Sequence, residues 1–289
     1  MRRAGEKAMQ ALLLICALTA VACLLLIAAY LILAGVPAMR EIGLGDFLFG
    51  RTWDPGNQTE PKLGILPMLL ATVCGAAGAI ALGVPLGLLT ALFLAKAAPS
   101  WLAGAVRELV NLLAGIPSVV CGLVGMCVLT PWLRERLGLA AGDTLLAAIL
   151  MLAVMILPNV VSVSETALAA VPEAYEEASL ALGATETETW FRVSLPAAGS
   201  GVAAAVVLGV GRAMGEAMAV LMVAGNVANM PSLLSGARFL TTGIAMELGY
   251  APVGSLQRQA LFSIGLVLFC IVIAINILLD LALRGRRTA

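Results

Sequence analysis

Residues 171–201 read VPEAYEEASLALGATETETWFRVSLPAAGSG, a polar segment that lies between two long apolar runs. The segment carries five glutamates and one arginine, so it cannot lie in the hydrocarbon of a membrane. Pro172 suits the first turn of a helix, the residues after it are good helix formers, and Gly183 is a typical helix end. A second short helix is predicted to end at Pro196. We therefore predict a helix–turn–helix whose apolar side chains available for contact are Tyr175, Ala178, Leu182 and Trp190.

The rest of the chain has the composition of an integral membrane protein. Of its 289 residues, 61% are hydrophobic and 12% are charged, whereas soluble domains are about a quarter charged. Backbone groups in lipid must be satisfied within each segment, and the alternating pattern of barrel strands is absent, so we predict an all-α bundle. Apolar windows long enough to cross a bilayer predict six spans in a single domain, 1–289, at roughly 10–34, 64–95, 109–131, 144–166, 200–228 and 259–281.

Positive charge at the two ends of the chain suggests its orientation. The first apolar run is too long for the core of a signal peptide, so it is expected to be a retained first helix. The basic residues that flank the first and last spans are Arg2, Arg3, Lys7, Arg284, Arg286 and Arg287. Cytoplasmic segments are enriched in such residues, and an even number of spans places both termini on one side. We therefore expect both termini and the segment 172–200 to be cytoplasmic.

The residue inventory leaves little room for catalysis by this chain. The sequence has no histidine, and none of its three lysines is followed by the Ser or Thr of a phosphate-binding loop. All six cysteines lie in apolar runs without a CxxC pair, so we interpret them as packing residues. We expect no catalytic residue, metal site or cofactor, and a net charge of zero does not suggest nucleic acid. If this membrane protein uses the energy of a nucleotide, a partner must hydrolyse it.

The polar segment resembles the EAA loop of bacterial ABC importer permeases, which has the pattern EAA-x3-G-x9-I-x-LP. The residues that match it, with Ser for Ala and Val for Ile, are Glu177, Ala178, Ser179, Gly183, Val193, Leu195 and Pro196. The resemblance implies a MetI-like bundle in which this loop is a coupling helix that sits in a groove of a separate ATP-hydrolysing subunit. An ordinary solvated acidic loop is the alternative.

Four further segments, 63–73, 112–125, 211–226 and 241–255, resemble the PstC-type permease subunits of phosphate importers. The resemblance implies a phosphate permease in the bacterial cytoplasmic (inner) membrane. Its implied partners are a second permease of PstA type, an ATPase dimer of PstB type and an extracytoplasmic phosphate-binding protein of PstS type. An importer of another oxyanion, such as molybdate or sulfate, is an alternative. A secondary transporter that uses an Arg–Glu pair is a more distant one.

Arg212 and Glu216 are the only charges in the fifth predicted span. If this span is helical, the two residues are one turn apart on one face. They could form an internal ion pair that fixes the packing of the bundle. Alternatively, Arg212 faces the substrate path, where a guanidinium matches the oxygens of phosphate, and Glu216 holds it and offsets its charge. We favour the second interpretation.

Ser118 and Asn226 are weaker candidates for the substrate path. Each could donate a hydrogen bond to an oxyanion, but each could equally bond to a backbone carbonyl. The segment 239–250, with a single Glu247, is expected to be a short surface helix near the docking site of the binding protein.

Glycine and proline predict local features of the spans. Gly83 with Gly87, and Gly211 with Gly215, form GxxxG pairs that favour close helix packing, although glycine is also common in membrane helices generally. Pro117 and Pro158 are expected to kink the third and fourth spans.

Overall fold

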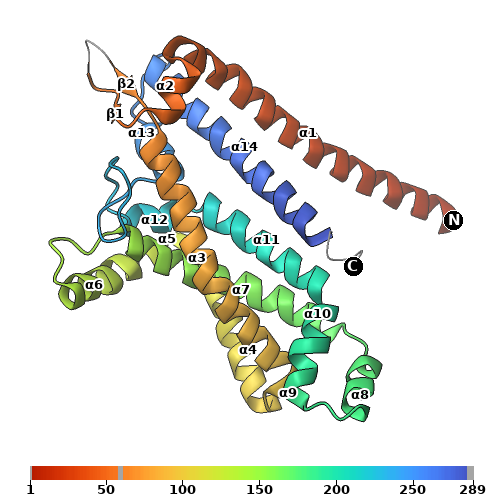
Figure 1. Cartoon of the computed structure of the whole chain (residues 1–289). Coiled ribbons are helices and arrows are strands. Elements are labelled where there is room, and N and C mark those ends of the chain that lie inside the picture. Colours follow the sequence, from red (N-terminus) through yellow and green to blue (C-terminus); the bar gives the residue numbers. More distant parts are fainter. Residues whose placement is uncertain (1, 58–60, 285–289) are drawn as a thin grey trace.

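The computed structural model describes residues 2–57 and 61–284, which form a helical bundle with a polar helical extension at one end and a small hairpin at the other (Figure 1). Five of the described helices are long and apolar enough to cross a membrane. A sixth span results if the bent pair Glu186–Ala197 and Gly199–Gly215 is counted as one. The predicted all-α membrane bundle is confirmed. Arg286 and Arg287 lie outside the described residues.

Three helices form the centre of the bundle. α3 (Leu66–Leu92) and α7 (Leu145–Ala169) pack along their lengths, and α11 (Gly199–Gly215) packs against both. α7 is apolar around most of its circumference, and 61% of its most apolar window is buried within this one chain. Pro158 lies inside α7 without interrupting it. This helix is therefore the core of the fold, and residues on it can support a site.

The approach of α3 to α7 depends on glycine. A Cβ atom at Gly83 would lie 2.7 Å from the side chain of Ile156, and one at Gly87 would lie 2.7 Å from Val160. Such distances are shorter than real Cβ contacts, so the predicted close packing at this pair is confirmed. Around Gly211 and Gly215 no described atom lies within 4 Å of such a Cβ, so close packing there is wrong within this chain.

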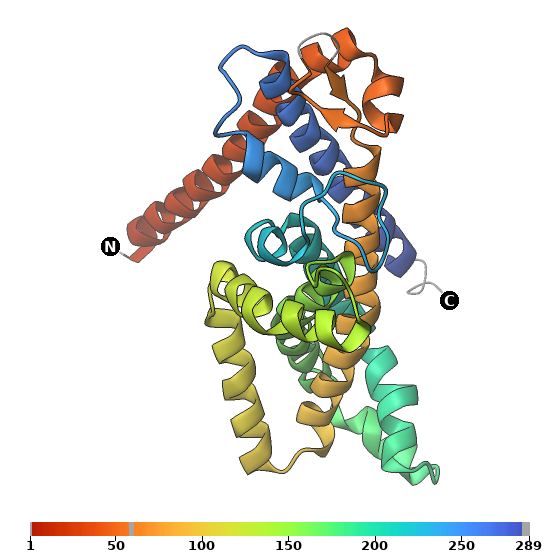
Figure 2. The same cartoon turned by 90° about the vertical axis from the view of Figure 1, so that its left-hand side faces the viewer.

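α1 (Arg2–Ile42) and α14 (Leu256–Arg284) form a second layer. They meet where Ser263 Oγ donates to the carbonyl of Gly35 at 2.6 Å, an approach that a side chain at Gly35 would obstruct. Toward its N-terminus α1 leaves the other helices, as Figures 1 and 2 both show. The most apolar window of α1 is unburied within this chain, so it is suited to lipid or to a neighbouring subunit.

The end of the bundle opposite the polar extension carries short elements. These are α2 (Leu44–Phe49), the antiparallel strands β1 (Trp53–Asp54) and β2 (Lys62–Leu63), and α13 (Leu240–Glu247). The amide of Leu240 donates to Thr72 Oγ1 on α3 at 2.9 Å, which fastens α13 to the central helices.

The third expected span, at 109–131, is broken rather than kinked. α4 (Ser100–Gly115) already begins before the expected span, in the stretch that the sequence left between the second and third spans, and ends at a glycine, and Ile116 and Pro117 are extended. α5 (Ser118–Val124) then starts in a new direction (Figure 2). The cause is local, because glycine is a poor helix former and the residue before a proline is pushed out of the helical region.

The fifth expected span, at 200–228, is also interrupted. α11 ends at Gly215, Glu216 has an extended backbone with ψ 125°, and α12 (Met218–Val223) is a separate short helix. Beyond α12, Gly225 and Asn226 take left-handed conformations that direct the chain into an outer loop. The expectation that Arg212 and Glu216 share one helical face is therefore wrong.

The polar extension contains the expected helices. α8 (Glu173–Ala181) is followed by Gly183 at φ 87°, the left-handed helix end that the sequence predicted. α9 (Glu186–Thr189) leads through a π-helical turn into α10 (Leu195–Ala197). The prediction that Pro196 ends the second helix is wrong, because proline is tolerated in a first helical turn. The chain bends by 72° only after α10, where α11 begins.

Three π-helical turns share one sequence context. They are η1 (Phe93–Ala97), η2 (Gly125–Leu129), which leads into α6 (Thr130–Leu137), and η3 (Trp190–Ser194). A proline comes two residues after each of them, namely Pro99, Pro131 and Pro196. In an α-helix the proline ring clashes with the carbonyl four residues earlier, and here that carbonyl always lies in the wider turn.

Candidate functional site

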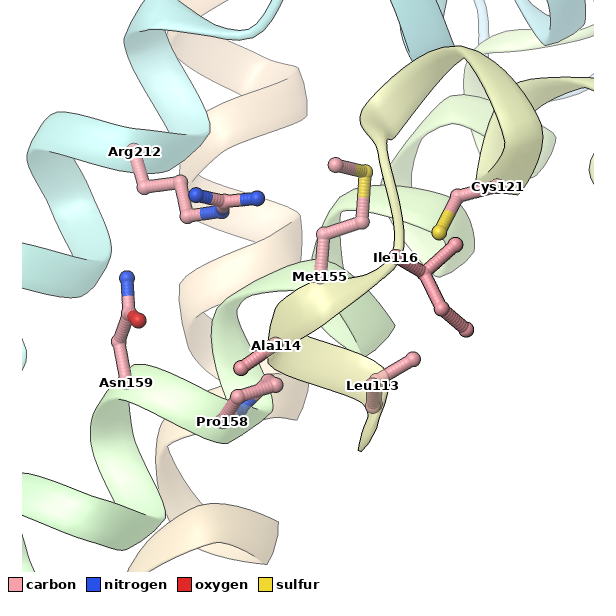
Figure 3. Close-up of a pocket in the computed structure, with 8 residues that line it drawn as sticks. All are labelled: Leu113, Ala114, Ile116, Cys121, Met155, Pro158, Asn159 and Arg212. Atoms are coloured by element: carbon pink, nitrogen blue, oxygen red, sulfur yellow. The ribbon is translucent and has the colours of Figure 1, made fainter. Parts of the chain in front are cut away.

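Arg212 extends from α11 toward the break between α4 and α5 (Figure 3). Its side chain is exposed and has neither a hydrogen bond nor an ion pair with any residue that the structure describes. Beside it is a cavity of about 20 Å³, lined by Leu113, Ala114, Ile116, Cys121, Met155, Pro158, Asn159 and Arg212. This volume is enough for about one water molecule, so within this chain the cavity is too small to enclose an oxyanion.

Asn159 is the second polar side chain of this cavity, and sequence reasoning missed it. It lies on α7 one residue after Pro158, is half-buried, and points toward the guanidinium of Arg212 (Figure 3). No hydrogen bond of its amide to another described residue was found. A signal was present in the sequence, because Asn159 is the only polar side chain in the run from Leu145 to Val161.

The chemistry of this cavity favours an anion. It combines a guanidinium with an amide, both without partners among the described residues, and its described lining includes no carboxylate. Hydrogen bonds between a guanidinium and an oxyanion are about twice as strong as neutral ones. The extended backbone at Ile116 lies on the other side of the cavity (Figure 3). An oxyanion that passes the α4–α5 break would therefore meet the donors of Arg212.

Glu216 is engaged elsewhere. Its Oε1 accepts a hydrogen bond from the amide of Ala219 at 3.2 Å, in the first turn of α12. Its backbone carbonyl accepts from Thr241 Oγ1 on α13 at 2.9 Å. The structure describes no ion pair between Glu216 and Arg212, which contradicts both the alternative of an internal pair and the favoured expectation that Glu216 holds Arg212. The helix break between the two residues is the reason.

The two weaker candidates differ in position. Ser118 is the first residue of α5, directly after the break, and is half-buried. Asn226 lies in the outer loop, does not line the cavity, and donates from Nδ2 to the carbonyl of Leu221 at 2.6 Å. The backbone carbonyl of Asn226 accepts a hydrogen bond from Arg238 Nε at 3.0 Å. Asn226 therefore shapes the loop, and a part for it in the path stays a prediction.

Some residues of the EAA pattern are exposed on the surface, and others hold the loop together. Glu177, Ala178 and Gly183 are exposed on and after α8. Ser179 is half-buried and its hydroxyl lies 2.8 Å from that of Thr189, so it joins α8 to α9. Leu195 is half-buried beneath the loop and Pro196 is exposed.

The apolar contact residues are divided in the same way. Tyr175 is 55% exposed and Leu182 is 90% exposed, so both are available to a partner. Trp190, in contrast, packs against a buried cluster at the base of the loop, and its expected availability is wrong. Because the surface side chains are carried by a helix with a supported base, the extension is suited to transmit force.

The turn between α8 and α9 is fixed by a capping box. The amide of Thr185 donates to Glu188 Oε2 at 3.1 Å, and the amide of Glu188 donates back to Thr185 Oγ1 at 3.3 Å. The hydrogen bonds from the backbone amide and then the hydroxyl of Thr185 lower the pKa of Glu188. The carboxylate is thus held in the charged form that α9 needs at its N-terminus.

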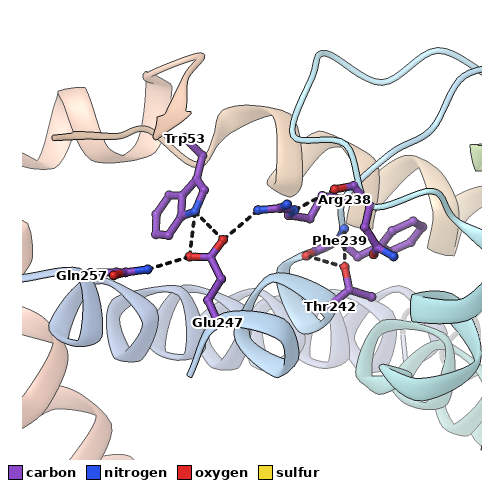
Figure 4. Close-up of polar contacts among 7 residues, drawn as sticks. Trp53, Arg238, Phe239, Thr242, Glu247 and Gln257 are labelled. Carbon is purple, nitrogen blue, oxygen red and sulfur yellow. Dashed lines mark hydrogen bonds and ion pairs between the residues drawn. The ribbon is translucent and has the colours of Figure 1, made fainter. Parts of the chain in front are cut away.

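The outer end of the molecule is joined by Glu247. Its carboxylate accepts from Trp53 Nε1 at 2.9 Å, from Arg238 Nη1 at 2.8 Å and from Gln257 Nε2 at 3.1 Å (Figure 4). The short helix expected at 239–250 is confirmed as α13, but Glu247 is partly buried and bonded rather than free at the surface. A docking site nearby stays a prediction. Sequence reasoning could not find these bonds, because Trp53 is 194 positions away in the chain.

Comparisons with known proteins agree with this architecture. Residues 83–285 match the family described as "Binding-protein-dependent transport system inner membrane component". The chain is 38% identical over 256 residues to the probable ABC transporter permease protein YqgH of Bacillus subtilis, covering 88% of this chain and 82% of that protein. It is 33% identical over 285 residues to the phosphate transport system permease protein PstC of Haemophilus influenzae, with coverage of 91% and 89%.

Two solved transporters share the fold. One is the methionine ABC transporter MetNI in an inward-facing conformation, with a TM-score of 0.62, 24% identity and coverage of 77% of this chain and 95% of that one. The other is a bacterial alginate ABC transporter in complex with a periplasmic protein bound to an alginate pentasaccharide. There the TM-score is 0.64, the identity 18% and the coverage 92% of each chain.

Proposed function

Because the chain belongs to the family of binding-protein-dependent transport system inner membrane components and is a permease subunit of an ABC importer, we propose that it carries inorganic phosphate across the bacterial inner membrane. It is a multi-pass membrane transport subunit and not an enzyme. Support for phosphate comes from relatives such as the Haemophilus influenzae PstC, which is similar over most of both chains.

The observation that carries the substrate proposal is the unpaired Arg212 at the α4–α5 break. A charged side chain among membrane helices costs free energy, so its presence there needs a reason. Arg212 has no described partner to neutralise it, and Asn159 adds a neutral amide to the same cavity. Phosphate would displace water from these groups and bind through a planar set of donors. Because the cavity of this chain is too small for the anion and Arg212 is exposed beside it, a second permease of PstA type would complete the path.

Transport would be driven through the polar extension. Glu177, Tyr175 and Leu182 lie on the exposed surface of α8, where a PstB-type ATPase dimer would bind. A PstS-type phosphate-binding protein would deliver substrate to the opposite end. In this orientation the extension is cytoplasmic, and the N-terminal end of α1 and the C-terminal end of α14 point away from the β1–β2 hairpin (Figure 1).

Phosphate uptake by the reconstituted complex tests the proposal. Proteoliposomes that contain both permeases and the ATPase are given the binding protein with labelled phosphate outside and ATP on the ATPase side. We expect ATP-dependent uptake that excess unlabelled phosphate suppresses and that sulfate or molybdate does not. Suppression by sulfate or molybdate at lower concentration than by phosphate would reject phosphate as the substrate.

Arg212→Gln should lower this uptake about tenfold or more, since a hydrogen bond to a charged group contributes about 1.5–3 kcal/mol. Arg212→Lys, which keeps the charge but not the planar donors, should have an intermediate effect. Arg136→Gln removes an exposed arginine of α6 outside the cavity and is the matched control. Unchanged uptake by Arg212→Gln at equal membrane expression would contradict the role of Arg212.

A further inference from the structure

Glu176 differs from the neighbouring glutamates of α8 because its carboxylate is already engaged. Its Oε1 lies 2.5 Å from Lys96 Nζ and accepts a hydrogen bond from Ser194 Oγ at 2.8 Å. The side chain of Glu176 is 19% exposed and that of Lys96 is 13% exposed, and Ser194 is fully buried. Glu177, one residue later, is exposed. Only one of these two adjacent carboxylates is thus presented to a partner.

The three residues of this contact come from three different segments. Lys96 belongs to η1, the last turn of the α3 span. Glu176 belongs to α8, and Ser194 ends η3, which leads through α10 into α11. α8 is therefore tied through one carboxylate oxygen to the end of the α3 span and to the segment that leads into α11.

An apolar cluster lies at the same place and completes the connection. Its buried members come from α3, from the end of α7 and from the start of α11, namely Ala91, Leu92, Leu168, Val171 and Ala198. Trp190 and Leu195 of the extension pack against this cluster. The apolar contacts hold the base of the extension in place, but the hydrophobic effect does not depend on orientation. The ion pair is a directional contact and therefore fixes how α8 is oriented on that base.

The charge state of Glu176 supports a strong contact. Partial burial alone would raise the pKa of Glu176, but the hydrogen bonds from Lys96 and Ser194 outweigh that effect and the pKa is lowered. Glu176 is therefore charged at neutral pH and can pair with Lys96. Removing one member of such a shielded pair leaves an uncompensated charge, which disrupts far more than loss of an exposed pair.

We propose that Glu176, held by Lys96 and Ser194, is the positioning residue through which movement of α8 reaches α3 and α11. This inference rests on the proposed function, since it assumes that an ATP-hydrolysing partner moves α8. Glu176 itself does not contact that partner. Without the linkage, the partner would still bind α8 and hydrolyse ATP, but the central helices would follow its movement poorly.

The first test measures how much phosphate is accumulated per ATP hydrolysed by the reconstituted complex. Glu176→Gln and Lys96→Met should each lower this ratio about fivefold or more, which is the lower end of usual coupling between distant sites. Copurification of the ATPase subunit should not change. Glu186→Gln, which removes an exposed carboxylate of the same extension, is the control and should keep the wild-type ratio. An unchanged ratio in Glu176→Gln, or loss of ATPase binding together with uptake, would overturn the proposal.

The second test does not depend on the substrate. In the wild-type complex, ATP with vanadate should change the hydrogen exchange of both α8 and η1. In Glu176→Gln the change at α8 should persist and the change at η1 should be lost, and retention at η1 would overturn the inference. A wild-type complex that hydrolyses ATP without accumulating phosphate would reject the proposed substrate, while this exchange experiment would still decide on the linkage.

Exchanging the two charges of the pair tests the linkage even if the single variants fold poorly. The double variant Lys96→Glu/Glu176→Lys restores an ion pair with the opposite polarity, and Ser194 Oγ can accept a hydrogen bond from the new lysine. It should recover both the uptake ratio and the exchange response relative to either single substitution. Failure to recover in a double variant that assembles normally with the ATPase would count against the linkage.

Discussion

Arg212 and Asn159 come from different helices and line one cavity, which forms half of the anion path that we propose. Each is a polar group placed among apolar neighbours, and neither has a partner among the described residues. Polar and charged side chains among membrane helices cost free energy unless a partner or ligand satisfies them. Glu216, the carboxylate expected to pair with Arg212, instead accepts a hydrogen bond from the first turn of α12. The guanidinium therefore remains available to a mobile anion.

Asn159→Asp provides a test at the scale of single residues. The new carboxylate would lie at the same cavity as Arg212 and neutralise it, so phosphate would have to displace an internal partner. Uptake should fall about tenfold, and further than in Asn159→Ala, since hydrogen bonds to charged groups contribute about 1.5–3 kcal/mol. Asn111→Asp adds the same charge to α4 outside the cavity and serves as the control. Equal uptake by Asn159→Asp and the wild type would contradict the proposed path.

Among the elements, α3 and α7 determine how precisely the cavity is held. Their approach depends on glycines of α3 that lie against β-branched side chains of α7, as at Gly83 with Ile156. Association of helices in lipid is driven by packing, because lipid is as apolar as the helix surface. The breaks in the third and fifth spans, in contrast, come from glycine, proline and local caps. Rigid and broken helices thus meet at the same cavity.

Gly83→Ala should destabilise the protein by about 1–3 kcal/mol, because the added methyl group overpacks a filled interface. Gly211→Ala meets no described atom and should be neutral or more stable by about 0.5–1 kcal/mol from helix propensity. The midpoint of unfolding by SDS in mixed micelles would measure both. If Gly83→Ala were as stable as Gly211→Ala, the close packing of α3 on α7 would be wrong.

At the scale of the whole molecule, each end of the bundle has a carboxylate that joins separate segments. Glu176 connects α8 to the ends of central helices, and Glu247 connects the β1 hairpin, the outer loop, α13 and α14. The Arg212 cavity lies between these ends. Both ends are thus stiffened by partly buried charge, while the region between them contains the broken helices that can rearrange.

Glu247→Gln should loosen the outer end only. It removes the ion pair with Arg238 and weakens the acceptor for Trp53, so amides at 225–238, 53–57 and 62–63 should exchange hydrogen faster, by about tenfold for a loss of about 1.5 kcal/mol. Exchange in α7 should not change. Glu135→Gln, at an exposed position of α6, is the control. Unaltered exchange at the outer loop would show that Glu247 does not hold this end together.

Several features followed from the sequence alone, for a physical reason. Apolar length predicts a membrane helix because every backbone group in lipid must be satisfied locally. The end of α8 at Gly183 follows from the left-handed conformation that glycine tolerates. The spacing of the EAA pattern was enough to indicate the family, since it records a rigid local structure.

What the tertiary structure decided are the contacts between segments that are distant in the chain. Arg212 faces Asn159 because α11 packs on α7, and not because of any neighbour in its own span. Glu176 differs from Glu177 only because Lys96, 80 positions earlier, ends beside it. A periodic pattern reports which side of a helix is apolar, but side-chain partners depend on how helices are placed against each other. The sequence thus determined the membrane helices and the helical polar segment, and only packing decided which of the described charges are paired and that Arg212 has no described partner.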